Sequence, residues 1–255
     1  MITGGDWPVG YRLVSYDQLD STNDEAKRLA ESGEPEGTVV LARSQRRGRG
    51  RYGRVWHSAP GNLYLSVVLR PACLPAVAAE LSFAASLALA DTLTLLLPNG
   101  GAALAFKWPN DVMINRRKVS GILLETETTG DQQLIWVILG LGLNIASHPD
   151  DVAVPATGLA DQGVDESSPE DIGAAFCHQF KAWYDRWTDE GFPPLRTAWL
   201  ARAAGIGERM TVRIADRSVD GVAVAFDERC SLVLETDAGD RFTVTAGDIF
   251  FGAGG

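Results

Sequence analysis

Residues 103–145, ALAFKWPNDVMINRRKVSGILLETETTGDQQLIWVILGLGLNI, decide the fold. Their apolar and β-branched runs predict four successive strands, at 103–107, 112–115, 119–127 and 134–145. Arg116 and Arg117 form a tight turn between the second strand and the third. Four strands in a row, with no helix between them, are incompatible with the strand–helix alternation of a doubly wound fold.

The residues that precede this stretch predict further strands and two helices. Strands are expected at 11–16, 37–42 and 63–69, where apolar residues alternate or run together. Thr22 and Glu25 have the spacing of a capping box, which predicts the start of a helix there. A long helix rich in alanine and leucine is expected to start at Pro75 and to end before Pro98.

The residues that follow predict a loop, two helices and then a series of short strands. Residues 149–167 form an acidic loop, and Ser168 and Pro169 then begin a helix that runs through Trp187. A shorter helix covers 194–203. After Gly205, closely spaced short strands predict a small β-barrel or sandwich. These strands are expected at 210–214, 218–226, 231–236 and 241–245.

Together the elements predict an α+β fold. It consists of a mixed β-sheet flanked by helices, followed by a small C-terminal β-barrel. The expected domains are residues 1–205 and residues 206–255. A chain of 255 residues has the length of one large domain with a small appendage.

Charge is segregated along the chain. The formal net charge is −10, from 33 acidic and 23 basic residues, which argues against a protein that coats nucleic acid. Residues 119–180 contain ten acids and no lysine or arginine, whereas residues 43–54 contain six arginines and no acid. The arginine-rich segment is therefore the first candidate for a binding site.

Composition also predicts the compartment. The N-terminus lacks the basic start and the apolar run of a secretory signal. Glu80 and Asp91 interrupt the most apolar stretch, 74–97, which favours a core helix over a membrane span. The three cysteines are far apart and show no metal-ligand spacing. We therefore expect a cytoplasmic protein with reduced thiols, no membrane contact and no metal site made by protein ligands alone.

The segment QRRGRGRYGRVW, residues 45–56, contains a G-x-G-x-x-G pattern at Gly48, Gly50 and Gly53. A dinucleotide fingerprint must open a helix that receives the pyrophosphate, but a strand follows here. Guanidinium groups match phosphate and carboxylate oxygens, and glycines let the backbone approach a ligand closely. A polyphosphate site on a flexible loop fits the segment. Composition alone leaves a solvated basic loop or a nucleic-acid patch equally open.

A second motif lies at a strand end. Pro109 holds Trp108 in an extended conformation and interrupts strand pairing, which re-aims Lys107, Asn110 and Asp111 at a strand edge. A lysine, an amide and a carboxylate within five residues suit a polar site. By itself, an Asn-Asp pair at a strand end is also an ordinary turn.

Two further motifs lie on the strands that follow. Lys118 begins an apolar strand close to Gly121 and can point into a pocket as a fixed cation. Gly140 and Gly142 lie within the next strand, where glycine indicates the close approach of a ligand or of another backbone. A simple β-bulge would explain these two glycines equally well.

Taken in order, five motifs resemble those of biotin protein ligases. They are Ser-Thr-Asn at 21–23, Gly-Arg-Gly-Arg at 48–51, Lys-Trp-Pro-Asn-Asp at 107–111, Lys118 with Gly-Ile-Leu-Leu-Glu at 121–125, and Gly-Leu-Gly-Leu-Asn at 140–144. The resemblance covers nearly all of the chain. It implies a catalytic domain akin to class II aminoacyl-tRNA synthetases, with a C-terminal barrel. It also implies that biotin and ATP give biotinyl-adenylate and pyrophosphate, and that biotin then passes to a lysine of a biotin carboxyl carrier protein.

The resemblance implies roles for individual residues. In it, Lys118 bridges the biotin carboxyl and phosphoryl oxygens, and Asp111 positions or deprotonates the carrier lysine. The catalytic set is Lys118, Arg51, Lys107 and Asp111. The biotin-binding set is Ser21, Thr22, Asn23, Gln45, Arg49, Gly50, Arg51, Lys118 and Gly121. The set that binds ATP or the adenylate is Arg49, Arg51, Trp56, Asn110, Lys118, Gly142 and Asn144. Mg²⁺ is expected to be carried with ATP.

The expected partners are a carrier protein and the small molecules biotin and ATP. Some biotin ligases carry an N-terminal DNA-binding domain, for which the residues before Ser21 leave no room. We therefore expect a ligase that binds no nucleic acid. The resemblance also allows a homodimer. Lipoate ligases and octanoyltransferases share the architecture and are the alternative, although the motifs at 48–51 and 107–111 match the biotin branch better.

Overall fold

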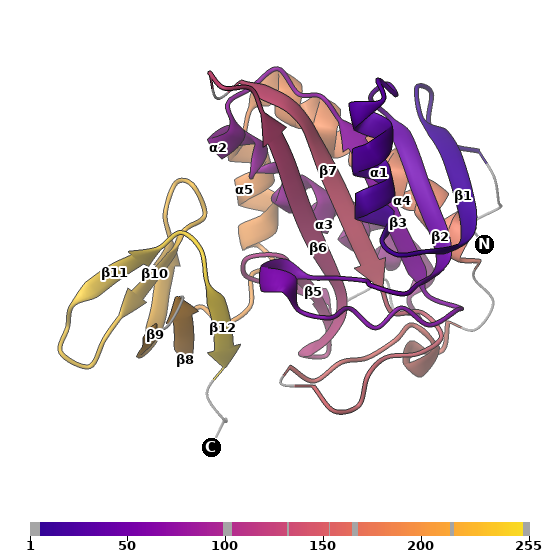
Figure 1. Cartoon of the computed structure of the whole chain (residues 1–255). Helices are drawn as coiled ribbons and strands as arrows, with labels where there is room; N and C mark the ends of the chain where they lie inside the picture. Colours follow the sequence, from indigo (N-terminus) through magenta and orange to yellow (C-terminus); the bar gives the residue numbers. More distant parts are fainter. Residues whose placement is uncertain are drawn as a thin grey trace.

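The computed structural model describes residues 6–98, 104–131, 133–152, 154–164, 168–214 and 217–251. Its larger sheet has seven strands in the order β1-β2-β3-β7-β6-β5-β4 (Figure 1). The strands β1 and β2 are parallel, joined through helix α1, and every other neighbouring pair is antiparallel. The bounds are β1 Arg12–Leu19, α1 Thr22–Glu31, β2 Thr38–Gln45, β3 Leu63–Leu69, β4 Leu104–Lys107, β5 Asp111–Ile114, β6 Arg117–Thr128 and β7 Leu134–Leu143.

Apolar side chains cover both faces of this sheet. On one face, alternate residues of three strands pack beneath α1; the cluster is Ala26, Leu29, Ala30, Val40, Val68, Trp136 and Ile138. On the other face, the intervening residues, such as Val67 and Leu139, pack against helices α3 and α4 in the main core. The helices outside α1 are α2 Pro75–Ala78, α3 Leu81–Leu96, α4 Pro169–Glu190 and α5 Pro193–Leu200.

The helix expected from Pro75 to Leu97 is present as two pieces, α2 and α3. Its span Pro75–Leu96 is long and apolar enough to cross a membrane, but 67% of its most apolar window is buried inside the protein. The two charged positions within it are also satisfied. Glu80 accepts a hydrogen bond from the Trp187 indole at 2.7 Å, and Asp91 accepts one from the Trp183 indole at 2.8 Å.

Two predicted helix starts had different outcomes. At α4, the Ser168 side chain accepts a hydrogen bond from the Glu170 amide, so the predicted cap is confirmed. At α1, the predicted capping box is wrong because the helix already includes Thr22. The Thr22 hydroxyl lies 3.2 Å from Gln45 Oε1, and the Glu25 carboxylate accepts from the Tyr16 hydroxyl instead.

The C-terminal residues form a second, five-stranded antiparallel sheet. Its bounds are β8 Arg209–Ile214, β9 Arg217–Phe226, β10 Leu232–Glu235, β11 Arg241–Val244 and β12 Asp248–Phe251. The order β11-β10-β9-β8-β12 leaves β11 and β12 at opposite edges, so the sheet is open and the expected closed barrel is not formed. The sequence had not predicted β12. The α+β class is confirmed.

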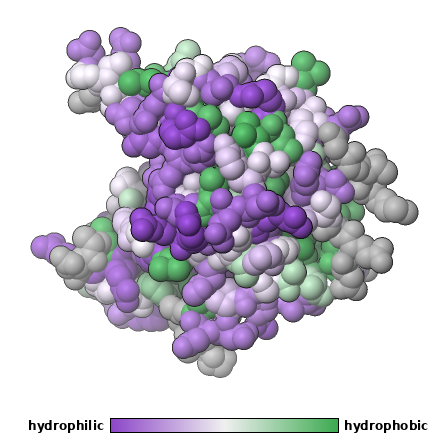
Figure 2. Space-filling view, turned by 45° about the vertical axis from the view of Figure 1, so that its right-hand side comes forward, coloured by the Kyte–Doolittle hydropathy of each residue, from purple (hydrophilic) through white to green (hydrophobic). Residues whose placement is uncertain are grey.

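The two sheets are joined by specific contacts. The Trp108 indole donates to the Cys230 carbonyl at 2.8 Å, and Arg116 forms a bidentate pair with Glu208 at 2.7 and 2.8 Å. The segment between α5 and β8 is also attached to the large sheet, because the Phe106 amide of β4 donates to the Arg202 carbonyl at 2.8 Å. In the space-filling view of Figure 2, hydrophilic residues cover most of the face shown, and apolar residues appear between them in small patches.

Candidate active site

A cavity of about 280 Å³ lies where helix α1 no longer covers its face of the large sheet. On β7, the residues under α1 are Trp136 and Ile138, and the next two on the same face are Gly140 and Gly142. Because the last two have no side chains, the sheet has a bare floor beside the first turn of α1.

The glycine floor leaves room for side chains that come from elsewhere. A Cβ atom on Gly140 would lie 2.2 Å from Asn23 Oδ1, and one on Gly142 would lie 2.5 Å from the Trp56 ring. Gly121, opposite Gly142 on β6, lies under the same indole, with a Cβ position 3.2 Å from it. The side chains that approach these glycines closely are therefore those of Asn23 and Trp56. The alternative of a β-bulge does not apply, because β7 keeps its register with β3 at these glycines.

A polar wall stands at one end of the floor. The Thr22 amide donates to Gln45 Oε1 at 2.8 Å, and Gln45 Nε2 donates to Ser58 Oγ at 2.9 Å. Ser58 in turn donates to the Trp56 carbonyl at 2.9 Å. These hydrogen bonds fix the orientations of the Gln45 and Ser58 side chains beside the cavity, and Ser21 lies next to them in the cavity wall.

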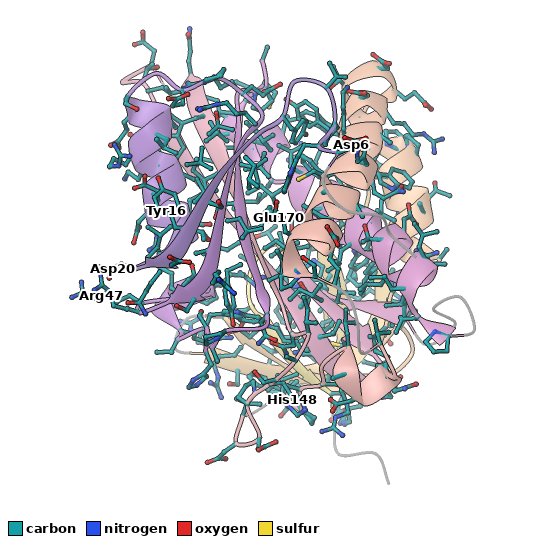
Figure 3. The ribbon with its side chains drawn as sticks, turned by 90° about the vertical axis from the view of Figure 1, so that its right-hand side faces the viewer. Asp6, Tyr16, Asp20, Arg47, His148 and Glu170 are labelled. Atoms are coloured by element: carbon teal, nitrogen blue, oxygen red, sulfur yellow. The ribbon has the colours of Figure 1, made fainter. Side chains whose placement is uncertain are left out.

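The six arginines of 43–54 divide into two groups. Arg49, Arg51 and Arg54 line the cavity. Arg43 and Arg46 lie outside it and face the carboxylates of Asp17 and Asp20, at 3.8 and 2.7 Å. Arg47 is also exposed, and Figure 3 shows it beside Asp20 at the rim of the sheet. Half of the arginines in this segment therefore face the cavity, and the other half lie outside it.

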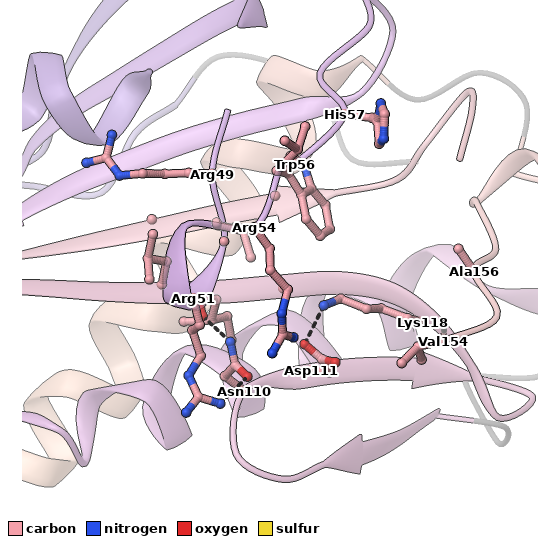
Figure 4. A pocket seen from close by; sticks show the side chains of 18 of the residues that line it. Arg49, Arg51, Arg54, Trp56, His57, Asn110, Asp111, Lys118, Val154 and Ala156 are labelled. Carbon is pink, nitrogen blue, oxygen red and sulfur yellow. Dashed lines mark hydrogen bonds and ion pairs between the residues drawn. The ribbon is translucent and has the colours of Figure 1, made fainter. Parts of the chain in front are cut away.

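The three arginines of the cavity differ in their partners. Arg49 lies 2.7 Å from Asp24 and 3.0 Å from Glu125, and the pKa of its guanidinium is raised, chiefly by the hydrogen bond with Asp24. Arg51 donates to the Gly247 carbonyl at 3.1 Å. Its contact with Asn110 Oδ1 is longer, at 3.4 Å (Figure 4). Arg49 thus lies in a carboxylate-lined corner, whereas the Arg51 guanidinium has neutral hydrogen-bond partners and a more distant carboxylate, that of Asp248 at 4.0 Å.

Lys118 is the central cation of the cavity. Its Nζ lies 2.6 Å from Asp111 Oδ1 and 5.3 Å from the centre of the Trp56 ring (Figure 4). The lysine and the aspartate therefore form a close ion pair inside the cavity, in which each charge compensates the other.

Lys107 supplies a second ammonium group from the end of β4. It is almost fully buried, and its Nζ lies 5.8 Å from the Phe250 ring and 5.9 Å from the Phe251 ring. Burial lowers the pKa of Lys107, while the negative charge of Asp111 acts in the opposite direction. Two lysines thus approach Asp111 from neighbouring strands.

The C-terminal sheet forms part of the cavity wall, which the sequence did not reveal. Asp248 forms an ion pair with Arg54, and Ile249 and Phe250 line the cavity beside it. The acidic loop also contributes: the Lys118 amide donates to the Pro155 carbonyl at 2.7 Å. The apolar residues of this loop that face the cavity are Val152, Val154 and Ala156.

All fifteen residues predicted for the three site sets line this cavity. Asn144 is the most constrained of them, since it is buried and its side-chain amide donates to the Thr157 carbonyl at 3.1 Å. The prediction missed Arg54, although it lies in the arginine-rich segment, and it missed Asp248. The described part of the chain contains no cluster of three or more His, Cys, Asp or Glu side chains that could hold a metal ion.

A concave site with a bare floor, a polar wall and several cations is typical of an enzyme that brings two anionic ligands together. Comparison with known proteins shows which family within this class of enzymes the chain belongs to. The sequence model of the biotin/lipoate A/B protein ligase family matches residues 15–144, and that of the biotin protein ligase C-terminal domain matches residues 205–252. The chain belongs to the biotin/lipoate A/B protein ligase family, on its biotin protein ligase branch.

Two relatives illustrate the similarity. The chain is 40% identical to the biotin–[acetyl-CoA-carboxylase] ligase of Paracoccus denitrificans, over 92% of its own length and 98% of the relative's. It is 34% identical to the bifunctional ligase/repressor BirA of Bacillus subtilis, over 91% of its own length and 71% of the relative's.

Solved structures have the same fold. The biotin protein ligase from Aquifex aeolicus in complex with biotin and ATP superposes with a TM-score of 0.78 at 24% identity, covering 94% of this chain and 97% of that one. The biotin protein ligase from Leishmania major in complex with biotinyl-5-AMP superposes with a TM-score of 0.62 at 25% identity, covering 94% and 100%.

Proposed function

We propose that this protein is a biotin–[biotin carboxyl carrier protein] ligase. It activates biotin with ATP as biotinyl-5′-adenylate and transfers the biotinyl group to a lysine of a carrier protein. The observation that carries the proposal is the convergence of all five sequence motifs on one cavity, where two lysines and three arginines face a polar wall.

The first half-reaction joins two anions. An oxygen of the biotin carboxylate attacks the α-phosphorus of ATP, the new O–P bond forms, and pyrophosphate leaves with the electrons of the broken P–O bond. Lys118, central in the cavity, is suited to neutralise the carboxylate and the phosphoryl oxygens together. Arg51 and Lys107 are suited to the remaining phosphate charge, which favours the transition state over the separated anions.

The second half-reaction needs a neutral amine. The carrier lysine attacks the carbonyl of the mixed anhydride, an amide forms, and AMP leaves. The attacking nitrogen must lose a proton, and Asp111 is the carboxylate placed beside Lys118 to accept it or to hold the amine in position.

Mg²⁺ fits this site as the companion of ATP. It retains several water molecules and binds through substrate phosphates with one or two protein oxygens. The oxygens suited to it are those of Asp111 and Asn110, which lie beside the phosphate-binding cations. When bound, the ion would offset phosphate charge at the leaving pyrophosphate.

The proposed specificity for biotin can be tested directly against the alternative within the superfamily, which is a lipoate or octanoate ligase or transferase. Incubated with ATP and Mg²⁺, the protein is expected to release pyrophosphate with biotin and not with lipoate or octanoate. Addition of a purified biotin carboxyl carrier domain should then give a biotinylated lysine, detectable by mass spectrometry, only when ATP is present. Pyrophosphate release with lipoate but not biotin would refute the proposal.

We also propose that the protein binds no nucleic acid specifically and works in the cytoplasm. The net charge of −10 argues against nucleic-acid binding. So does the position of Arg49, Arg51 and Arg54, which lie inside a cavity of small-molecule size. An electrophoretic mobility shift with duplex DNA at physiological salt should show no retained complex. A specific, salt-resistant complex would contradict the expectation.

A homodimer that pairs at a sheet edge is the oligomeric state we propose to test. Within the large sheet, the edge strand β1 has β2 as its one hydrogen-bonded neighbour, which supports edge-to-edge pairing with a second copy. Sedimentation velocity of the purified protein, with and without biotin and ATP, separates a monomer from a dimer by mass.

A further inference from the structure

Glu125 lies beside the cavity but belongs to none of the site sets discussed above. It stands on β6, on the same face of the sheet as the bare floor, since it pairs with Ile138 of β7. Its carboxylate accepts a hydrogen bond from Asn23 Nδ2 at 2.6 Å and lies 3.0 Å from Arg49 Nη2. A single acidic side chain thus contacts two residues of the predicted biotin-binding set.

The Asn23 side chain lies across β7 between two other strands. Gly140 makes this arrangement feasible, because a Cβ atom there would lie 2.2 Å from Asn23 Oδ1. On the far side of β7, the Asn23 Oδ1 accepts a hydrogen bond from Ser66 Oγ of β3 at 2.6 Å. The amide therefore bridges Ser66 on β3 and Glu125 on β6.

The charge of Glu125 determines which end of the Asn23 amide faces each strand. A carboxylate can only accept, so it holds the NH₂ group of Asn23 toward β6 and the carbonyl oxygen toward β3. Ser66 must then donate its one hydroxyl hydrogen to Asn23. Thr22 Oγ1 lies 2.8 Å from Ser66 Oγ and 3.2 Å from Gln45 Oε1, so its own hydrogen is shared between these two acceptors. The Thr22 oxygen is left as an acceptor at the polar wall of the cavity.

The second partner of Glu125 is less dependent on it. Arg49 also lies 2.7 Å from Asp24, so loss of the Glu125 charge leaves Arg49 with a carboxylate at shorter distance. A change confined to the charge of Glu125 therefore acts mainly through Asn23.

We propose that Glu125 is a positioning residue for the biotin end of the cavity. Its carboxylate orients the Asn23–Ser66–Thr22 chain of hydrogen bonds, so that the polar wall presents one fixed pattern of donors and acceptors to the ring of the ligand. This inference rests on the proposed function, because it concerns how the same site recognises biotin.

The test is a double-mutant cycle on biotin binding, measured by isothermal titration calorimetry without ATP. Glu125→Gln keeps the size and removes the charge, and a glutamine amide can both donate and accept. The variant is expected to weaken biotin binding by about 10- to 100-fold, the usual effect of losing a charged hydrogen bond at a buried site. It should raise KM for biotin by a similar factor and change kcat less.

Coupling to Asn23 separates positioning from a general structural effect. In an Asn23→Ala background, Glu125→Gln should cause at most about a twofold further loss, because its partner is already absent. Equal losses in both backgrounds would overturn the proposal. Ser66→Ala interrupts the same chain from the other strand and is expected to weaken binding in the same direction, which covers the case in which Glu125→Gln fails to fold.

The matched control is Glu127→Gln, two residues further along β6 on the same face of the sheet. Glu127 is exposed and lies outside the cavity. Its variant should bind biotin as the unchanged protein does, and a loss equal to that of Glu125→Gln would overturn the proposal. Absence of biotin binding in the unchanged protein would instead count against the proposed function.

Discussion

Replacement of Lys118 by alanine is expected to reduce biotinyl-adenylate formation by at least about 100-fold, since removal of one preorganised charge donor has effects of this order. Lys118 Nζ is the cation nearest Asp111, at 2.6 Å, and it lies under the Trp56 ring in the middle of the cavity. Its loss leaves the carboxylate and the α-phosphate without a shared counter-charge. Pyrophosphate exchange in the presence of biotin measures this step without a carrier protein.

The control for Lys118 uses another of the four lysines. Lys181→Ala removes an exposed cation of α4 that pairs with Asp185, far from the cavity in sequence, and should leave the exchange rate unchanged. The fold of Lys118→Ala should be intact by circular dichroism and thermal unfolding. If the alanine variant is unstable, Lys118→Ala with Asp111→Asn removes both buried charges together. An exchange rate within about threefold of the unchanged protein would refute the assigned role of Lys118.

Replacement of Gly142 by alanine is the second change with a large expected effect. The new Cβ would lie 2.5 to 2.8 Å from three atoms of the Trp56 indole, which must leave the floor or push it aside. Overpacking of this kind costs about 1–3 kcal/mol, so binding of the adenylate, to whose site Gly142 and Trp56 are assigned, should weaken by about 10- to 100-fold. Calorimetric titration with biotinyl-adenylate measures the loss.

A matched glycine is available on the turn between β6 and β7. Gly130→Ala adds the same methyl group where no heavy atom lies within 4 Å and where the backbone is not left-handed. This variant should bind biotinyl-adenylate as the unchanged protein does. If Gly142→Ala also binds normally, the packing of Trp56 on the floor is not required for the site.

Local signals predicted those features that depend on neighbouring residues. The Ser168 cap and the proline at the start of α4 act within one turn, and both are present in the structure. Three of the five motifs converge because they lie on β4 to β7, which follow one another along the chain and in the sheet, and short connections favour this order. The resemblance to a family supplied their roles, which the spacing of residues could not.

Features that depend on partners far away along the chain could not be predicted from the sequence. Thr22 has the spacing of a capping box, but Gln45, on the next strand, takes its hydrogen bonds instead. The sequence indicated no partner for Arg49 within the protein, yet Glu125, from a strand far along the chain, lies against it. Strand β12 is four residues long and is recognisable only through its pairing with β8. In each case the deciding partner comes from another element.

The ion pair between Arg54 and Asp248 has a consequence for synthesis of the protein on the ribosome. A nascent chain that has emerged as far as Phe226 already contains every lysine and arginine of the cavity, but it lacks β12. The segment at 51–54 then has neither the Gly247 carbonyl nor the Asp248 carboxylate to hold it. Because N-terminal parts fold first during translation, the ligand site is completed only when β12 has been made and pairs with β8.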